Sequence, residues 1–156
     1  MAIEKAREYL KKFGADGRIL EFPQSSATVE LAAKAAGTEP CRIAKSLTFL
    51  VDDAAIMIVT AGDMKVDNQK FKQQFATKAK MLTPEQVDNM IGHSIGGVCP
   101  FGVNDGVKVY LDSSLKRFET VFPACGSSNS AIELKLDELE KFAQNFTAWI
   151  DVCKSM

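Results

Sequence analysis

The sequence has no long hydrophobic run and no excess of charge of either sign. Its longest apolar stretch, from Ala54 to Ala61, is far shorter than the roughly 20 residues that a membrane-spanning helix needs, so no membrane partner is expected. The N-terminus runs directly into a charged amphipathic pattern without an apolar signal segment, and we therefore expect a cytoplasmic location. Nineteen basic residues against twenty acidic ones give no broad positive field, which argues against a protein that wraps a long nucleic-acid duplex.

Histidine and cysteine are scarce, and their spacing does not form a metal site. The chain has one histidine and four cysteines without a C-x-x-C pair, which excludes a zinc ribbon; the cysteines are Cys41, Cys99, Cys125 and Cys153. Without a secretion signal, these cysteines are expected to be reduced and mostly buried thiols. The sequence therefore suggests no metal and no other cofactor.

The composition is that of an ordinary globular protein. With 156 residues, of which 46% are hydrophobic and 25% charged, the chain is expected to form one domain over residues 1–156 around a single core. Helical and strand patterns alternate along it, but tight turns join some of the strands, so a purely parallel sheet does not fit. The sequence predicts a single-domain α+β fold in which a mixed, mostly antiparallel sheet is flanked by helices.

Capping residues and hydrophobic spacing locate the elements. Helices are predicted at residues 2–13, 28–37, 67–76, 83–92 and 137–153. Strands are predicted at residues 18–22, 46–51, 54–60, 107–111, 119–122 and 131–136. Asp67 is a predicted N-cap because Val66 and Phe71 on either side of it form a hydrophobic staple, and Thr83 is one because it begins a capping box with proline at the next position. Asp52 and Asp53 form the two-residue turn of a predicted hairpin.

Two loops rich in small residues are candidate ligand sites. Residues 96–102 contain three glycines, whose backbone amides could approach a ligand closely, although the loop could equally be a tight connection between strands. This loop has neither the ending of a Walker P-loop nor the spacing of a Rossmann motif. Residues 124–130 are rich in serine and could hydrogen-bond a small polar ligand or simply satisfy turn amides.

Three further features could carry chemistry. His93 lies six residues before Cys99, so a Cys–His nucleophilic pair must be considered. Residues 65–80 hold five lysines and one acid, which is typical of a nucleic-acid patch or of a solvated helix face. Lys45 precedes an apolar strand, and its ammonium is either buried there or reaches water along its flexible stem.

Several motifs occur in the order of the signatures of one family. They are Ile43-Ala44-Lys45-Ser46-Leu47, the loop at residues 96–102, Val121-Phe122 leading to Gly126, and Ala131-Ile132-Glu133-Leu134. In these the chain resembles the YbaK/prolyl-tRNA-synthetase-associated editing family over roughly residues 5–147. The resemblance implies that family's mixed fold and a freestanding aminoacyl-tRNA deacylase that removes a small non-cognate amino acid from tRNA(Pro). The implied partners are the 3′ end of mischarged tRNA(Pro) and prolyl-tRNA synthetase.

The same resemblance implies roles for individual residues. Lys45 matches the active-site lysine of the family, whose ammonium is expected to position the terminal phosphate or ribose. The catalytic G-x-x-x-P loop of the family corresponds to Gly96, Gly97, Val98, Cys99 and Pro100. Its amides would hold the aminoacyl ester while the 2′-hydroxyl of the tRNA assists the attack of water. The expected substrate-binding residues are Thr28, Gly102, Cys125, Gly126, Ser127, Ser128 and Asn129.

Departures from the family pattern leave the amino acid open. Alanine-specific members tend to carry a histidine where this sequence has Cys125, although Asn129 is retained. Members that act on cysteine tend to carry an acid where this sequence has Ala131. Alanine, cysteine, serine and 2-aminobutyrate therefore all stay as candidates for the amino acid removed.

Two other functions are compatible with the sequence. The chain could be a non-catalytic module that binds tRNA or a synthetase through the lysines of residues 65–80. It could also be a thiol hydrolase that uses Cys99 and His93. Whichever function is right, an exposed apolar face on the first or last helix could support a homodimer.

Overall fold

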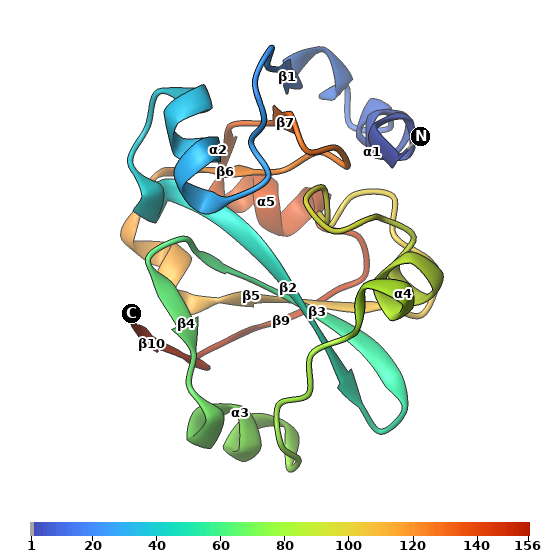
Figure 1. The fold of residues 1–156 in the computed structure, drawn as a ribbon, viewed down its shortest axis with the longest axis vertical. Helices are drawn as coiled ribbons and strands as arrows, with labels where there is room; N and C mark the ends of the chain where they lie inside the picture. Colours follow the sequence, from blue (N-terminus) through green and yellow to red (C-terminus); the bar gives the residue numbers. More distant parts are fainter. Residues whose placement is uncertain (1) are drawn as a thin grey trace.

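The computed structural model describes residues 2–156 as a mixed α+β fold built around a six-stranded sheet (Figure 1). The strand order is β8-β6-β2-β3-β5-β9. In chain order these strands are β2 (Ile43–Val51), β3 (Ala54–Ala61), β5 (Lys108–Asp112), β6 (Thr120–Pro123), β8 (Leu134–Lys135) and β9 (Phe146–Ile150). Two small antiparallel pairs complete the fold, β1 (Leu20–Glu21) with β7 (Ser130–Ala131) and β4 (Met64–Val66) with β10 (Cys153–Ser155).

Strand directions in the central sheet are mixed, as the sequence predicts. β2 pairs antiparallel with β3, and β6 pairs antiparallel with β8. The contacts β2–β6, β3–β5 and β5–β9 are parallel, and each is reached through a long crossover. The predicted α+β fold with a mixed sheet is therefore confirmed.

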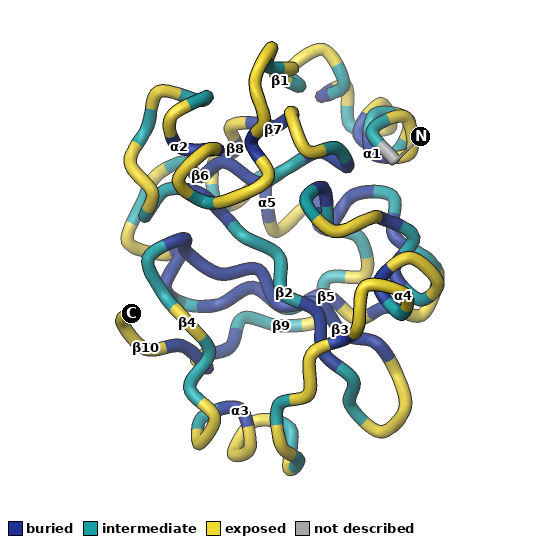
Figure 2. Tube along the Cα trace, viewed as in Figure 1, coloured by how far each residue is buried: buried dark blue, intermediate teal, exposed yellow. Residues whose placement is uncertain are grey.

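The long hairpin of β2 and β3 is the centre of the molecule. Asp52 and Asp53 both have positive φ values, 50° and 64°, which is the backbone of the tight turn predicted for this pair. Side chains of β3 alternate between two cores, because Met57 and Val59 pack on one face of the sheet and Ile58 packs on the other. Figure 2 shows β3 as almost entirely buried and β2 as a mixture of buried and half-buried residues.

The helices cover both faces of this sheet. They are α1 (Ala2–Lys11), α2 (Val29–Ala36), α3 (Asn68–Phe75), α4 (Pro84–Gln86) with its continuation η3 (Val87–Ile91), and α5 (Leu136–Phe142). Short turns lie at η1 (Asp16–Arg18), η2 (Pro40–Arg42) and η4 (Ser113–Arg117). The predicted N-caps Asp67 and Thr83 are confirmed, since each accepts a hydrogen bond from a backbone amide in the first turn of its helix, and Thr28 caps α2 in the same way. None of the helices in residues 2–156 is long and apolar enough to cross a bilayer.

The prediction of a closing helix at residues 137–153 is wrong beyond its first two turns. α5 ends at Phe142, and the chain then forms β9 and β10. Apolar residues spaced by four fit a helix, but Phe146 to Ile150 are also rich in aromatic residues and pair in parallel with β5. A positive φ of 59° at Asn145 separates the two elements, and asparagine adopts this conformation more readily than most residues. The strand that follows depends on its tertiary pairing with β5. The predicted strand at residues 131–136 is likewise divided into β7 and β8.

Candidate active site

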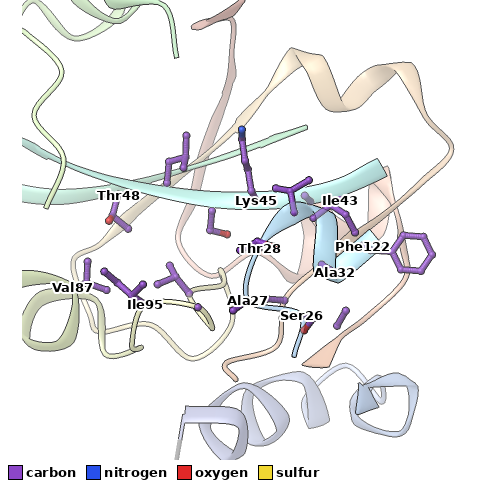
Figure 3. A pocket seen from close by; sticks show the side chains of 18 of the residues that line it. Ser26, Ala27, Thr28, Ala32, Ile43, Lys45, Thr48, Val87, Ile95 and Phe122 are labelled. Atoms are coloured by element: carbon purple, nitrogen blue, oxygen red, sulfur yellow. The ribbon is translucent and has the colours of Figure 1, made fainter. Parts of the chain in front are cut away.

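A cavity of about 260 Å³ opens at one edge of β2 (Figure 3). Five segments that are distant in sequence enclose it: the start of α2, the first half of β2, the chain leading into α4, the glycine loop, and the strands β6 and β7. Its lining includes Ser26, Ala27, Thr28, Val29, Ala32, Ile43, Ala44, Lys45, Ser46, Leu47, Thr48, Met81, Leu82, Val87, Ile95, Gly96, Val98, Phe122, Ala124, Ser130 and Ala131. Lys45 is the one charged residue among them.

The cavity exists because β2 lacks a neighbour over part of its outer edge. β6 pairs with β2 only at Ile43 and Ala44. Further along β2, the chain after α3 bonds to the same edge. The Leu50 amide donates to the Lys80 carbonyl at 2.8 Å, and the Leu82 amide donates to the Thr48 carbonyl at 3.2 Å. Between Ala44 and Thr48, no strand of residues 2–156 pairs with this edge of β2. Side chains of the flanking loops surround this gap instead.

The glycine loop can pack as it does only with glycine at two positions. Gly96 has a φ of +97°, a backbone conformation that side chains other than glycine rarely adopt. A Cβ on Gly97 would lie 2.6 Å from the Gly126 carbonyl carbon and 2.6 Å from the Ser127 amide nitrogen. The two predicted loops are therefore in direct backbone contact. Gly96 and Val98 line the cavity, whereas Gly97, Cys99 and Pro100 lie behind it.

Lys45 lies at the cavity, but its ammonium is directed elsewhere. Figure 3 shows its side chain extending from β2 away from Val87 and Ile95. The ammonium donates to the carbonyl oxygens of Met64 and Gly62, on the chain around β4. Burial lowers the pKa of this lysine from its ordinary value. The structure thus places Lys45 and the glycine loop at the same cavity, with the ammonium bonded to the chain around β4.

Cys99 and His93 are in contact, but they are arranged as core residues. Cys99 Sγ lies 3.5 Å from His93 Nε2, and Nε2 lies 2.7 Å from the Phe101 carbonyl oxygen. Because a carbonyl oxygen only accepts, Nε2 carries the hydrogen and cannot take a proton from the thiol. Burial raises the pKa of Cys99 to about 12. A thiolate nucleophile is strongly disfavoured in this arrangement.

The second loop makes its hydrogen bonds within the protein. Ser127 Oγ donates to Asn129 Oδ1 at 2.9 Å or to Ser130 Oγ at 2.7 Å. Asn129 also donates to the Phe22 carbonyl at 3.1 Å. The residues that line the cavity from this region are Ala124, Ser130 and Ala131, while the predicted residues Cys125, Gly126, Ser127, Ser128 and Asn129 stand behind them. These five residues support the wall of the cavity rather than forming its surface.

The other expected positions are divided between the cavity and the scaffold. Thr28 lines the cavity and also caps α2 through its hydroxyl. Gly102 lies outside the lining, with a φ of +74° and so close to α1 that a Cβ would lie 2.8 Å from the Lys5 carbonyl oxygen. Its glycine is explained by this close approach.

Much of the lining was not predicted from the sequence. Ser46 and Thr48, together with Lys45, are the polar residues of a strand that is otherwise apolar, and this was the available signal. Met81 and Ile95 are 59% and 62% exposed, so large apolar side chains stand open at the cavity. No local pattern predicts that these segments converge, because the gap in the sheet edge arises only from the tertiary fold.

Comparison with known proteins identifies the family. The family model of the aminoacyl-tRNA editing domain matches residues 24–142. Uncharacterized protein YwhH of Bacillus subtilis (strain 168) is 52% identical over 155 residues, 99% of this chain and 98% of that protein. A proline–tRNA ligase of Lactiplantibacillus plantarum is 36% identical over 76 residues, which are 48% of this chain but only 13% of the ligase.

The solved structures agree with the sequence comparisons. A structure described as a candidate trans-editing enzyme for prolyl tRNA synthetase matches with a TM-score of 0.88 and 27% identity, over 99% of this chain and 98% of that one. The family model covers most of the chain, including the start of α2, β2 and both loops that form the cavity. This chain belongs to the aminoacyl-tRNA editing domain family.

Proposed function

We propose that this chain is a freestanding editing deacylase, which hydrolyses the ester between tRNA(Pro) and a small non-cognate amino acid. The observation that carries the proposal is the cavity of about 260 Å³ beside the glycine loop, in a chain of the editing family related to proline–tRNA ligases. A synthetase site built for proline discriminates against smaller residues by only about 1–3 kcal/mol, so a second hydrolytic site is chemically needed. On this proposal residues 1–156 act as one editing domain in the cytoplasm, with prolyl-tRNA synthetase as a partner.

The cavity suits a small side chain with few polar groups. Its walls are formed largely by aliphatic side chains, among them Val29, Ala32, Leu82 and Val87. Alanine, cysteine, serine and 2-aminobutyrate are the amino acids we propose for it. The short side chains of Ala27 and Ala124 leave space beside the ester.

The proposed mechanism is attack of water on the ester carbonyl. The bond between the carbonyl carbon and the ribose oxygen breaks, the water oxygen joins the carbonyl, and the products are the free amino acid and tRNA. Amides of the Gly96–Pro100 loop would stabilise the developing oxyanion, a contribution of about 3 kcal/mol for one well-placed donor. The 2′-hydroxyl of the terminal ribose would orient the water. Lys45 would exchange its bonds to the carbonyls of Met64 and Gly62 for the adjacent phosphate or ribose.

A deacylation time course tests this proposal. tRNA(Pro) charged separately with alanine, cysteine, serine, 2-aminobutyrate and proline is incubated with the wild-type chain and with Lys45→Ala. We expect selective hydrolysis of one or more small esters, reduced at least about a hundredfold in the variant because the RNA end is no longer positioned. If folded wild-type protein hydrolyses none of these esters, the activity is refuted. An unchanged rate in Lys45→Ala would refute the role of the lysine alone.

A non-catalytic module is the alternative that the surface supports. Lys65, Lys72, Lys78 and Lys80 are exposed on α3 and its flanking segments. Lys70 differs from them, because it pairs with Asp151 at 3.2 Å. Binding of tRNA that weakens with salt, together with no turnover on any of the five esters, would support this alternative over the deacylase.

A further inference from the structure

Ser46 is the residue of β2 at the centre of the uncovered edge. In an antiparallel pair, alternate residues turn both main-chain groups to the same side. Thr48 and Leu50 turn theirs outward, because they bond to the chain at Leu82 and Lys80. Ser46 lies two residues before Thr48 in the same strand, so its N–H and C=O also face outward. There β2 has no neighbouring strand within residues 2–156, and these groups open toward the cavity.

The hydroxyl of Ser46 adds a third free polar group at the same point. Its Oγ is buried and has no hydrogen-bond partner within residues 2–156. Three of the other four hydroxyls of the lining have partners: Ser26 donates to the Ser128 carbonyl, Thr28 accepts from the Leu31 amide, and Ser130 bonds with Ser127. The fourth belongs to Thr48, on the same strand as Ser46. A buried polar group without a partner is costly, and native structures retain such a group mainly where a ligand or water completes it.

The chemistry of these groups points to a hydrogen-bond donor on the ligand. A carbonyl oxygen can only accept, so the C=O of Ser46 must meet an N–H or an O–H. At the reacting end of an aminoacyl-tRNA the hydrogen-bond donors are the α-ammonium and the 2′-hydroxyl. In the proposed mechanism the 2′-hydroxyl binds the attacking water, which leaves the α-ammonium. The one charged residue of the lining is Lys45, whose ammonium is held by the carbonyls of Met64 and Gly62. The C=O and the hydroxyl of Ser46 thus form an acceptor site separate from that positive charge, beside the N–H of the same residue.

We infer that Ser46 is the substrate-binding residue that holds the α-ammonium of the aminoacyl group, through its main-chain carbonyl and its hydroxyl. This inference rests on the proposed deacylase function and extends it, because it assigns recognition of the charged amino group to a specific residue. The ammonium takes the place that a neighbouring strand would occupy at the sheet edge. Its fixed position directs the ester carbonyl toward the glycine loop and the amino-acid side chain into the apolar part of the cavity.

The experiment is a cycle of two proteins and two substrates. Wild type and Ser46→Ala are compared on tRNA(Pro) charged with the best amino acid and on the matching 2-hydroxyacyl ester, in which a neutral hydroxyl replaces the ammonium. Rates are corrected for the spontaneous hydrolysis of each ester. We expect Ser46→Ala to lower kcat/KM about tenfold on the aminoacyl ester, the loss of one hydrogen bond to a charged group, and less than about twofold on the hydroxyacyl ester.

Other results of the cycle overturn the inference. An equal loss on both esters would mean that Ser46 acts on the shared ribose or carbonyl, and no loss on either would mean that its hydroxyl does not touch the substrate. Absence of wild-type turnover on the aminoacyl ester would refute the proposed function itself and the inference with it. Ser113→Ala, which changes a serine outside the cavity lining, serves as the matched control and should leave both rates unchanged.

A thermal melt separates binding from a structural role. Because the Ser46 hydroxyl is buried without a partner among residues 2–156, Ser46→Ala should melt at the same temperature as wild type or higher, although its activity is lower. A hydroxyl that stabilised the fold would give the opposite result, with a lower Tm in the variant. A lower Tm accompanied by an equal loss of activity on both esters would therefore assign Ser46 to the scaffold.

Discussion

Cys99 Sγ, in the glycine loop, lies 3.5 Å from Nε2 of His93, and both residues are buried. The contact has the spacing of a catalytic pair but the wrong hydrogen arrangement, since the ring nitrogen that faces the sulfur already donates to the Phe101 carbonyl. The pair fills space and fixes the base of the loop. Its chemistry is therefore tested by removing the thiol.

Cys99→Ser should retain deacylation within about threefold of wild type, because the proposed mechanism uses no thiolate and the substitution removes no reacting group. The measurement is a deacylation time course on the preferred ester, with a thermal melt to show that the variant is folded. If a folded variant lost activity by about a hundredfold or more, the result would support the alternative that the protein is a thiol hydrolase. Cys41→Ser is the control, because Cys41 is only partly buried and lies outside the cavity lining.

The single histidine makes the stability of the protein depend on pH in a simple way. Burial lowers the pKa of His93 below its ordinary value of 6.5. The unfolded chain therefore takes up a proton, as pH falls below about 6.5, that the folded protein does not bind. The free energy of unfolding should fall between about pH 6.5 and 5, with a slope of at most about 1.4 kcal/mol per pH unit for one proton.

Urea unfolding at several pH values measures this slope, and His93→Asn provides the comparison. The variant is expected to be less stable near neutral pH, because it loses the bond to the Phe101 carbonyl, but its stability should change less than that of wild type as the solution is acidified. The chain contains no second histidine, so an equal slope in the variant would contradict the assignment to His93.

Gly97→Ala should disrupt the contact between the two loops. The new Cβ would lie 2.6 Å from backbone atoms of Gly126 and Ser127, and backbone cannot move aside as a flexible side chain can. We expect a loss of about 1–3 kcal/mol in the free energy of unfolding, as for overpacked sites, together with a marked loss of deacylation because the proposed oxyanion donors shift. Denaturant unfolding and the deacylation assay measure the two effects.

Gly17→Ala is the matched control for this substitution. Nothing lies within 4 Å of the Cβ that would be added at Gly17, so its effect on stability should stay within about 0.5 kcal/mol and activity should not change. If Gly97→Ala behaved like Gly17→Ala in both assays, the close approach of the loops would matter neither for stability nor for deacylation.

The sequence predicted the local features of this fold better than its tertiary ones. Caps at Asp67 and Thr83 and the turn at residues 52–53 depend on neighbouring residues, and all three are present in the structure. The strand β9 was mistaken for helix because its pairing with β5 lies outside local sequence. The same contrast holds for the candidate site. Motif resemblance pointed to Lys45 and the glycine loop, whereas Ser46 was singled out only by the uncovered sheet edge, which no sequence motif describes.

The exposed lysines of α3 and the following segment should bind the tRNA outside the cavity. Lys72 and Lys78 line a shared groove with Asn68 and Gln69, without an acidic residue in its lining. From this groove the chain continues through Lys80 to Met81 at the cavity. A basic track at this place suits the phosphates that precede the 3′ end of the RNA, because each neutralised phosphate releases counterions.

The double variant Lys72→Glu/Lys78→Glu should therefore raise KM for charged tRNA and leave kcat nearly unchanged. The dependence of log kcat/KM on log salt should also become shallower, by about one unit for each phosphate that the variant no longer neutralises. Hydrolysis of a minimal ester on a terminal adenosine, which has no upstream phosphates, should not change. Lys141→Glu is the control, since this lysine is exposed on α5 and lies outside both cavity and groove. Equal effects of both variants on KM would mean that net charge, and not the α3 groove, attracts the tRNA.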